Sequence, residues 1–151
     1  MKYRIGIDPG ATGAIVVMED DFRLIEWAHM PVMKVGSAIR VNGAEVAQML
    51  RDFDCGNAYL EQVGAMPGQG VASMFNFGHS AGTIAGVLAA MSIAVTLVTP
   101  QSWKKRAGIP SGSDKDAARS RAIQLWPSWR DLALKGKGQA LADAALIARF
   151  G

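Results

Sequence analysis

GIDPGATGA, residues 6–14, joins two short apolar runs and contains a single carboxylate, Asp8. In residues 3–7 a tyrosine and two isoleucines alternate with arginine and glycine, which predicts a strand that ends at Asp8. Pro9-Gly10 is typical of a tight turn, and the apolar run 14–18 predicts a second strand that returns beside the first. The predicted hairpin therefore places one carboxylate at the end of a strand.

This position suits Asp8 to bind a metal ion or a phosphate. Side chains alternate between the two faces of a strand, so Asp8 shares a face with Arg4 and Gly6 rather than with the isoleucines. A carboxylate beside a glycine turn can hold a cation, and the glycines let a phosphate come close. The alternative is an Asp-Pro-Gly turn that only begins a hairpin. Convergence of other carboxylates on Asp8 would decide between the two.

Length and composition predict one globular domain spanning residues 1–151. Half of the residues are hydrophobic and 19% are charged, which is typical of a chain that buries one core. The single cysteine, Cys55, excludes a disulfide framework and a cysteine-built zinc site, and it fits a reducing compartment. No signal-peptide pattern precedes the first strand. We therefore expect a protein of the cytoplasm, in a bacterial or phage-infected cell, or of an organelle, and not a secreted one.

Residues 82–98 contain no charge over seventeen positions, which is the lower limit for a membrane span. The second half of this stretch, residues 93–98, is rich in β-branched residues and predicts a strand that follows a helix. We therefore expect no membrane-spanning segment.

The net charge of +3 is unevenly distributed along the chain. Residues 1–100 hold six Lys and Arg against nine Asp and Glu, whereas residues 101–137 hold nine against three. A basic third beside a mildly acidic remainder indicates a polyanionic partner. The alternative is a charged face that only contacts water.

Strands at the start of the chain, followed by alternating helices and strands, predict a mixed α/β sheet flanked by helices. We expect further strands at residues 22–30, 58–63 and 93–98. We expect helices at residues 43–54, from a glycine-rich loop (64–70) to about Met91, at 100–107, from a Ser113 cap to Trp126-Pro127, and at 139–150. Residues 32–41 and 127–137 are predicted to be loops.

The long helix carries Gly78, Gly82 and Gly86 at four-residue spacing. This spacing places the three glycines on one face, where another backbone can come close. The face either packs onto the sheet or forms the seam of a homodimer.

Two further acids lie in apolar surroundings. Glu61 follows Tyr59-Leu60 in a predicted strand, and Asp143 is the only charge in residues 139–148, where it shares a helical face with Leu146 and Ile147. Burying such acids without a partner is costly. Two strand ends and the start of a helix can bring Asp8, Glu61 and Asp143 together, and oxygen ligands of this kind suit Mg²⁺ or Mn²⁺. Two such ions could drive phosphodiester hydrolysis. The alternative is a separate salt bridge for each acid.

With these motifs in order, the chain resembles the RuvC-like Holliday junction resolvases of the ribonuclease H-like nuclease superfamily, enzymes of DNA recombination and repair. The resemblance covers nearly the whole length. It rests on GIDPGATGA (6–14), LEQVGAMPGQGVASMFNFGHSAG (60–82), VTPQSWKKRAGIP (98–110), SDKDAARSRAIQLWP (113–127) and GQALADAALIARFG (138–151). It implies a five-stranded mixed sheet flanked by helices, and a homodimeric Mg²⁺-dependent endonuclease whose catalytic, metal-binding acids are Asp8, Glu61 and Asp143. A dimer matches the two-fold symmetry of a four-way junction.

One position departs from the family pattern, which has a further Asp or His one helical turn before the last acid. Gln139 and Ala140 occupy that turn here. This departure has three interpretations: the ion keeps more waters, Lys135 or Lys137 supplies positive charge to the transition state, or the chain binds junctions without cutting them quickly. The sequence leaves these three possibilities open.

The same resemblance and the basic third of the chain predict the residues that contact DNA. The cationic candidates are Lys104, Lys105, Arg106, Lys115, Arg119, Arg121, Arg130, Lys135 and Lys137. Phe75 and Phe77 are candidates to wedge against unstacked bases, with core packing as the alternative, and Met66 and Gln69 are weaker candidates for the same role. Trp103, Trp126 and Trp129 are interpreted as packing residues.

Three rival functions remain at this stage. A related nuclease of the same fold would cut flaps, forks or RNA–DNA hybrids. The pattern from Asp8 to Thr12 also resembles the phosphate hairpin of actin-like sugar kinases, which need two such domains and a second phosphate loop, more than 151 residues allow. A junction-binding protein without efficient catalysis is the third.

Overall fold

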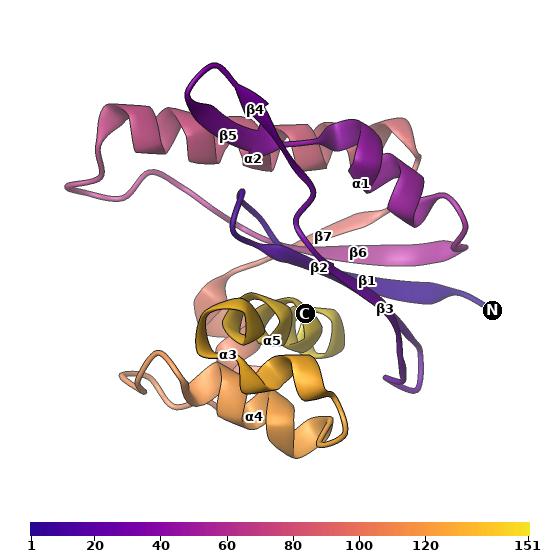
Figure 1. Cartoon of the computed structure of the whole chain (residues 1–151). Helices are drawn as coiled ribbons and strands as arrows, with labels where there is room; N and C mark the ends of the chain where they lie inside the picture. The colour runs from indigo at the N-terminus through magenta and orange to yellow at the C-terminus, as the bar shows by residue number, and fades with distance from the viewer.

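The computed structural model describes all residues, 1–151, and places a five-stranded sheet between two layers of helices (Figure 1). The strand order is β3-β2-β1-β6-β7. The strands are β1 (Tyr3–Asp8), β2 (Ala14–Glu19), β3 (Leu24–His29), β6 (Cys55–Glu61) and β7 (Val95–Val98). The first three pair antiparallel, while β6 and β7 continue the sheet parallel to β1. The predicted five-stranded mixed sheet is confirmed.

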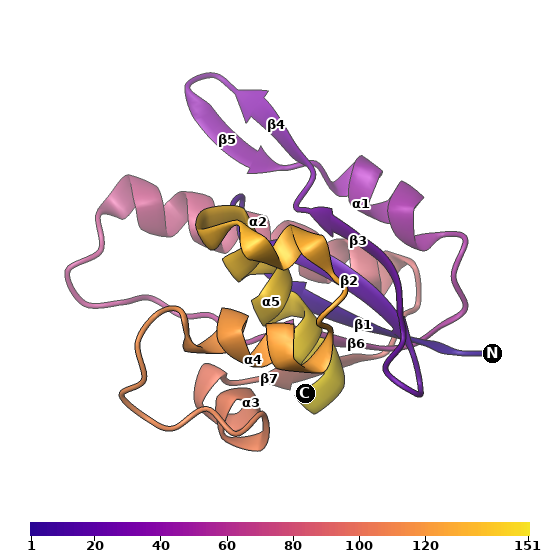
Figure 2. The same cartoon turned by 60° about the horizontal axis from the view of Figure 1, so that its bottom comes forward.

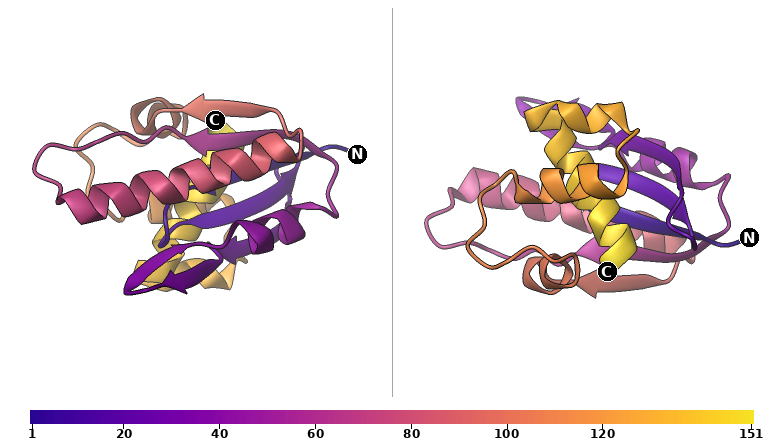
Figure 3. Two further views of the ribbon diagram at one scale, coloured as in Figure 1. Left: turned by 90° about the horizontal axis from the view of Figure 1, so that it is seen from above. Right: turned by 90° about the horizontal axis from the view of Figure 1, so that it is seen from below.

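Each face of the sheet is covered by its own helices and its own core (Figures 1 and 2). Helices α1 (Gly43–Leu50) and α2 (Val71–Ala90) cover one face, where the isoleucines of β1 are fully buried. Helices α3 (Pro100–Arg106), α4 (Ala117–Leu125) and α5 (Lys135–Phe150) cover the other, with a 3₁₀ turn at Arg130–Ala133. Seen from either side, α2 and α5 cross the sheet on opposite faces (Figure 3).

None of the helices combines the length and the apolar character needed to cross a membrane. The uncharged stretch 82–98 is divided between the end of α2 and the strand β7, as predicted.

Residues 32–41 form a second, two-stranded sheet, so the predicted loop is wrong. Strands β4 (Val32–Val35) and β5 (Ala38–Val41) pair antiparallel, and β5 packs against α2. The turn between them is Gly36-Ser37, and Gly36 has a φ of 62°, a conformation that glycine adopts without strain. A Gly-Ser pair between β-branched or apolar runs is a hairpin signal, which the scattered polar residues obscured.

Three other predicted boundaries are corrected by the structure. Helix α1 ends at Leu50 rather than at residue 54, because residues 55–57 belong to β6, where Cys55 pairs with Tyr3 of β1. Helix α4 begins at Ala117, and Ser113 does not cap it, since the Ser113 hydroxyl donates to the carbonyl of Pro110 at 2.6 Å. Helix α5 begins at residue 135, four residues earlier than predicted, so the predicted loop 127–137 contains the 3₁₀ turn and the first turn of α5.

The glycines of α2 do not pack on the sheet. Gly78, Gly82 and Gly86 are exposed, and a methyl group added at any of them would have no atom within 4 Å. The predicted packing of this stripe onto the sheet is wrong, and the face points away from the rest of the chain.

Gly6 is where α5 comes closest to the sheet. A methyl group on Gly6 would lie 1.9 Å from the carbonyl oxygen of Ala144 and 2.5 Å from the nitrogen of Ala148. On the same face of β1, the Arg4 Nε donates to the carbonyl of Ala148 at 2.9 Å. The expected shared face of Arg4, Gly6 and Asp8 is thus the one that α5 covers. Only glycine allows backbone-to-backbone contact at this point.

Gly6→Ala should destabilise the protein by about 2–3 kcal/mol or more, because forcing atoms into a packed core typically costs 1–3 kcal/mol and here the obstacle is backbone. Urea unfolding measures the change. Gly136→Ala is the matched control, since a methyl group there meets nothing within 4 Å and a helical Gly-to-Ala change is worth at most about 1 kcal/mol. Equal stability of the two variants would contradict the close approach at Gly6.

Candidate active site

Three carboxylates gather at one end of the sheet, on the face that α5 covers. Asp8 ends β1 and Glu61 ends β6, and the two strands run parallel with Ile7 opposite Leu60, so both acids reach the same edge. Asp143 is on α5, which lies across β1 because Gly6 has no side chain. The sequence-predicted convergence of the three acids is thus seen in their mutual electrostatic influence.

Burial raises the pKa of all three acids, and repulsion by neighbouring carboxylates adds to it for Asp8 and Asp143. The pKa of Asp8 rises to about 8, chiefly through burial and then through the negative charges of Asp143 and Glu61. The pKa of Asp143 rises to about 7 through burial and the charge of Glu61. Burial also raises the pKa of Glu61. A cluster of carboxylates with raised pKa values is typical of a functional site rather than of a structural ion pair.

Separate salt bridges do not explain these acids. The two salt bridges of the structure join Arg23 to Glu19 and Arg119 to Asp116, and neither includes a site acid. The positive charge of Lys104 lowers the pKa of Asp8, Glu61 and Asp143, but Lys104 forms no salt bridge with any of them. The salt-bridge alternative is therefore wrong.

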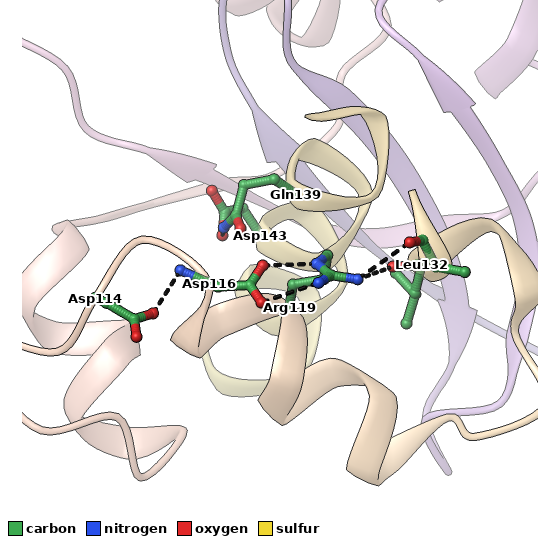
Figure 4. Close-up of polar contacts among 7 residues, drawn as sticks. Asp114, Asp116, Arg119, Leu132, Gln139 and Asp143 are labelled. Carbon is green, nitrogen blue, oxygen red and sulfur yellow. Dashed lines mark hydrogen bonds and ion pairs between the residues drawn. The ribbon is translucent and has the colours of Figure 1, made fainter. Parts of the chain in front are cut away.

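Glu61 and Asp143 each accept a hydrogen bond from one neutral side chain. The Trp103 indole Nε1 donates to Glu61 Oε2 at 2.7 Å, and the Trp103 side chain is fully buried. The Gln139 Nε2 donates to Asp143 Oδ1 at 3.0 Å, one turn earlier on α5 (Figure 4). Sequence reasoning treated Trp103 as packing alone, since nothing local in the sequence links it to a residue 42 positions away. Gln139 fills the position where the resemblance leads us to expect a charged ligand, and Ala140 is buried.

The donor set suits a hard divalent cation, although the side chains as arranged do not enclose one. No group of three or more His, Cys, Asp or Glu side chains surrounds a common position. The available donors are carboxylate oxygens with an amide nearby, the chemistry that Mg²⁺ and Mn²⁺ prefer. Bound positive charge would also relieve the repulsion that raises the pKa of the acids. On donor chemistry and electrostatics, the residues fit such an ion.

A cleft of about 840 Å³ opens beside Asp143 and Gln139. It lies between α3, the loop 107–116 and the start of α4. Its cationic lining is formed by Lys104, Lys105 and Lys115, all of them exposed. The cleft therefore offers a polyanion a positively charged path to Asp143.

The remaining predicted DNA-contacting cations fall into two groups. Arg106, Arg119 and Arg121 are used within the fold: the Arg106 Nη1 donates to the carbonyl of Phe150, and the Arg121 Nε donates to that of Ala107. The Arg119 guanidinium binds both carboxylate oxygens of Asp116 and the carbonyl of Leu132 (Figure 4).

Arg130, Lys135 and Lys137, by contrast, are exposed. Lys137 lines a smaller cleft beside Thr12 and His29, and the charge of Lys135 acts on Asp116 rather than on the site acids.

The residues predicted to wedge against bases differ in their contacts and in their exposure to solvent. Phe77 lies against the turn after Asp8, with ring atoms about 3 Å from where a side chain on Gly10 would begin. Phe75 is 61% exposed and Met66 is 66% exposed. Gln69 is half-buried in the loop before α2. Trp126 and Trp129 pack edge to face in the α5-side core, in agreement with their interpretation as packing residues.

Two solved structures share the backbone arrangement of this chain over nearly its whole length. A structure of T. thermophilus RuvC in complex with Holliday junction substrate matches 99% of this chain and 92% of its own, with a TM-score of 0.68 and 17% sequence identity. A second Thermus thermophilus RuvC structure matches 97% and 90%, with a TM-score of 0.62 and the same identity. Comparisons with family models and with curated sequences found no match. The RuvC likeness is therefore one of backbone arrangement, and the RuvC-like ribonuclease H-type fold is confirmed.

The metal-free protein should lose stability as the pH rises from about 5 to 8.5. The pKa values of Asp8 and Asp143, about 8 and about 7, lie well above the ordinary value of an aspartate, so the folded state binds more protons than the unfolded state and is favoured at low pH. Removing the charge with Asp8→Asn should flatten this decline and stabilise the protein at pH 8.5 by about 1 kcal/mol or more, roughly 2–4 °C in Tm.

Thermal unfolding in EDTA across this pH range tests the expectation. Asp52→Asn, which changes an exposed carboxylate, should leave the wild-type pH profile as it is. A wild-type Tm that stays level or rises from pH 5 to 8.5 would show that the acids do not repel one another.

Proposed function

We propose that the protein is a metal-dependent endonuclease that binds four-way DNA junctions as a homodimer and nicks them by hydrolysis. The observation that carries the proposal is the set of three half-buried carboxylates, Asp8, Glu61 and Asp143, whose pKa values are raised and of which Asp143 lines a lysine-lined cleft. Holding ionised carboxylates together and partly out of water costs free energy in the metal-free chain, and a bound divalent cation offsets this cost.

The protein's own residues would hold the ion and orient the DNA. Asp8, Glu61 and Asp143 would supply its carboxylate ligands, and a bound Mg²⁺ or Mn²⁺ would activate water and stabilise charge on the phosphate. The Trp103 indole fixes the rotamer of Glu61, and Gln139 fixes that of Asp143. Lys104 is placed to bind the phosphate beside the acids, and Lys105 and Lys115 to bind its neighbours along the strand.

The choice of a four-way junction as substrate draws on the structural likeness. The matched RuvC structure is itself a complex with a Holliday junction substrate, and the two chains superpose over nearly their full lengths. We assign phosphate contacts to the predicted cations that are exposed and make no hydrogen bond or ion pair within the chain. Three of them line the cleft, Lys104, Lys105 and Lys115, and the other three lie outside it: Arg130, Lys135 and Lys137.

The homodimer is proposed from symmetry and from the exposed face of α2. Two opposed cuts at a two-fold symmetric junction need two active sites. Gly78, Gly82 and Gly86 leave a smooth face with nothing against it in one copy of the chain, so the same helix of a second copy can approach closely there.

A second candidate is a junction-binding protein with slow cleavage. It is favoured by one observation: the turn before Asp143 presents the neutral Gln139 and the buried Ala140 in place of an ionisable ligand. An ion held by three protein carboxylates would then be bound less tightly.

Asp8→Asn, Glu61→Gln and Asp143→Asn should each reduce nicking by at least about 100-fold while leaving junction affinity nearly unchanged, because even residues that support metal ligands commonly contribute 10- to 100-fold. The measurement is cleavage of a labelled four-way junction in Mg²⁺ and in Mn²⁺, with affinity determined in EDTA. Asp52→Asn should cut at the wild-type rate.

Duplex, flap and RNA–DNA hybrid substrates of equal length complete the experiment. Wild-type cleavage that prefers a flap or a hybrid would contradict the junction assignment. Tight junction binding without nicking in either metal would favour the second candidate, and wild-type rates in the carboxamide variants would contradict the site itself.

A further inference from the structure

Helix α3 begins beside the site, directly after β7 ends. Val98, the last residue of β7, pairs with Glu61, the last residue of β6. Thr99 then caps α3, because its side chain accepts a hydrogen bond from a backbone N–H of the first turn at 3.2 Å. Trp103 and Lys104 follow one turn later. A strand pair and a capped helix, rather than a loop, therefore position these two side chains relative to Glu61.

Trp103 is a rigid hydrogen-bond donor. Its side chain is fully buried in the core on the α5 side of the sheet, and close packing of that kind fixes the orientation of the indole. The indole Nε1 donates to Glu61 Oε2 at 2.7 Å, which is the one hydrogen bond that the Glu61 side chain makes. Burial alone does not give an indole an acceptor in this fold, since the buried Nε1 of Trp129 has none. Glu61 is thus held through one oxygen, and its Oε1 remains free to bind an ion.

The ring of Trp103 also contacts the ammonium group of Lys104. The Lys104 Nζ lies 5.5 Å from the centroid of the Trp103 ring. Lys104 forms no salt bridge, and its charge acts on all three site acids. An indole face attracts an ammonium group without neutralising it, as a carboxylate would. Trp103 therefore contacts an acid through its N–H and a cation through its ring.

We infer that Trp103 is a positioning residue with two separate roles: its N–H orients Glu61 for a bound ion, and its ring holds Lys104 for a phosphate of the DNA. The inference rests on the proposed function and goes beyond it, because it assigns the relative placement of a metal ligand and a phosphate-binding lysine to one buried side chain. Substitutions that keep the ring should therefore affect metal binding alone, and substitutions that remove it should also affect DNA binding.

The first test uses the wild-type protein and does not depend on cleavage. In ¹⁵N-labelled protein, each of the four tryptophans gives one indole N–H signal, and Trp-to-Phe variants at positions 27, 126 and 129 identify the signal of Trp103 by elimination. Titration with Mg²⁺ should move the Trp103 signal, because its acceptor Glu61 becomes a metal ligand, and leave the other three in place. A Trp103 signal that stays fixed while calorimetry shows Mg²⁺ binding would overturn the inference.

The second test separates the N–H from the ring. Trp103→Phe, which keeps a ring and removes the N–H, should weaken Mn²⁺ binding by roughly tenfold, the lower end of the effect of residues that orient metal ligands. Its affinity for a labelled four-way junction in EDTA should be that of the wild type. Trp103→Leu, which also removes the ring, should in addition weaken junction binding in EDTA by about two- to fivefold, the value of an exposed cation–π contact.

Trp126→Phe is the matched control. Trp126 packs against the same core, and its Nε1 donates to the carbonyl of Phe22 at 3.1 Å, so the variant also loses an indole hydrogen bond but leaves Glu61 and Lys104 untouched. It should lower the Tm and keep both affinities of the wild type. If Trp103→Leu does not fold, the ε-methylene protons of Lys104 in the wild type test the ring contact, because an indole face shifts them upfield.

The outcomes separate this inference from the proposed function. If Trp103→Phe lowers the Tm but binds Mn²⁺ as tightly as the wild type, Trp103 is a packing residue only and the inference is overturned. Wild-type junction affinity in Trp103→Leu, or unshifted Lys104 protons, would refute the role of the ring. If the wild type binds no divalent cation, or shows no preference for a junction over duplex DNA, it is the proposed function that fails.

Discussion

The contact between Gly6 of β1 and the backbone of α5 is the constraint on which the rest of the site depends. A helix that crosses a sheet normally stays at a distance set by side chains, yet here the carbonyl of Ala144 occupies the space of a missing methyl group. Asp143 precedes Ala144 directly, so the close approach also fixes how near Asp143 comes to Asp8. The close packing at Gly6 therefore brings Asp8 and Asp143, which are far apart in the sequence, near enough to influence each other's pKa.

This coupling lowers the stability of the folded protein, and other contacts of the fold compensate for the loss. Burial disfavours the ionised forms of Asp8, Glu61 and Asp143, and repulsion between carboxylates adds to this for Asp8 and Asp143. The indole of Trp103, the amide of Gln139 and the nearby charge of Lys104 offset part of that cost. Two cores, one on each face of the sheet, supply the stability that makes the remainder tolerable. A site that is destabilising alone and stabilised by a ligand is typical of metal-dependent enzymes.

The sequence predicted the sheet and its acids because both leave local signals. Asp8 ends an alternating strand, and Asp143 interrupts an apolar helical face, so each can be found without knowing the fold. The contacts that depend on distant residues could not be found in this way. Trp103 donates a hydrogen bond to Glu61, which is 42 positions away in the sequence. Arg119, which was predicted to contact DNA, instead donates hydrogen bonds to Asp116 and to the carbonyl of Leu132. The hairpin at residues 32–41 was missed because its alternation is short and half of its side chains remain exposed.

The central claim is that Asp8, Glu61 and Asp143 share a divalent cation, and a crystal soaked in Mn²⁺ tests it most directly. We expect an anomalous density peak between the three side chains, with an oxygen of each within coordination distance and Gln139 beside the ion. A peak bound elsewhere, or density that shows Asp8 and Asp143 sharing a proton with no ion between them at saturating Mn²⁺, would contradict it.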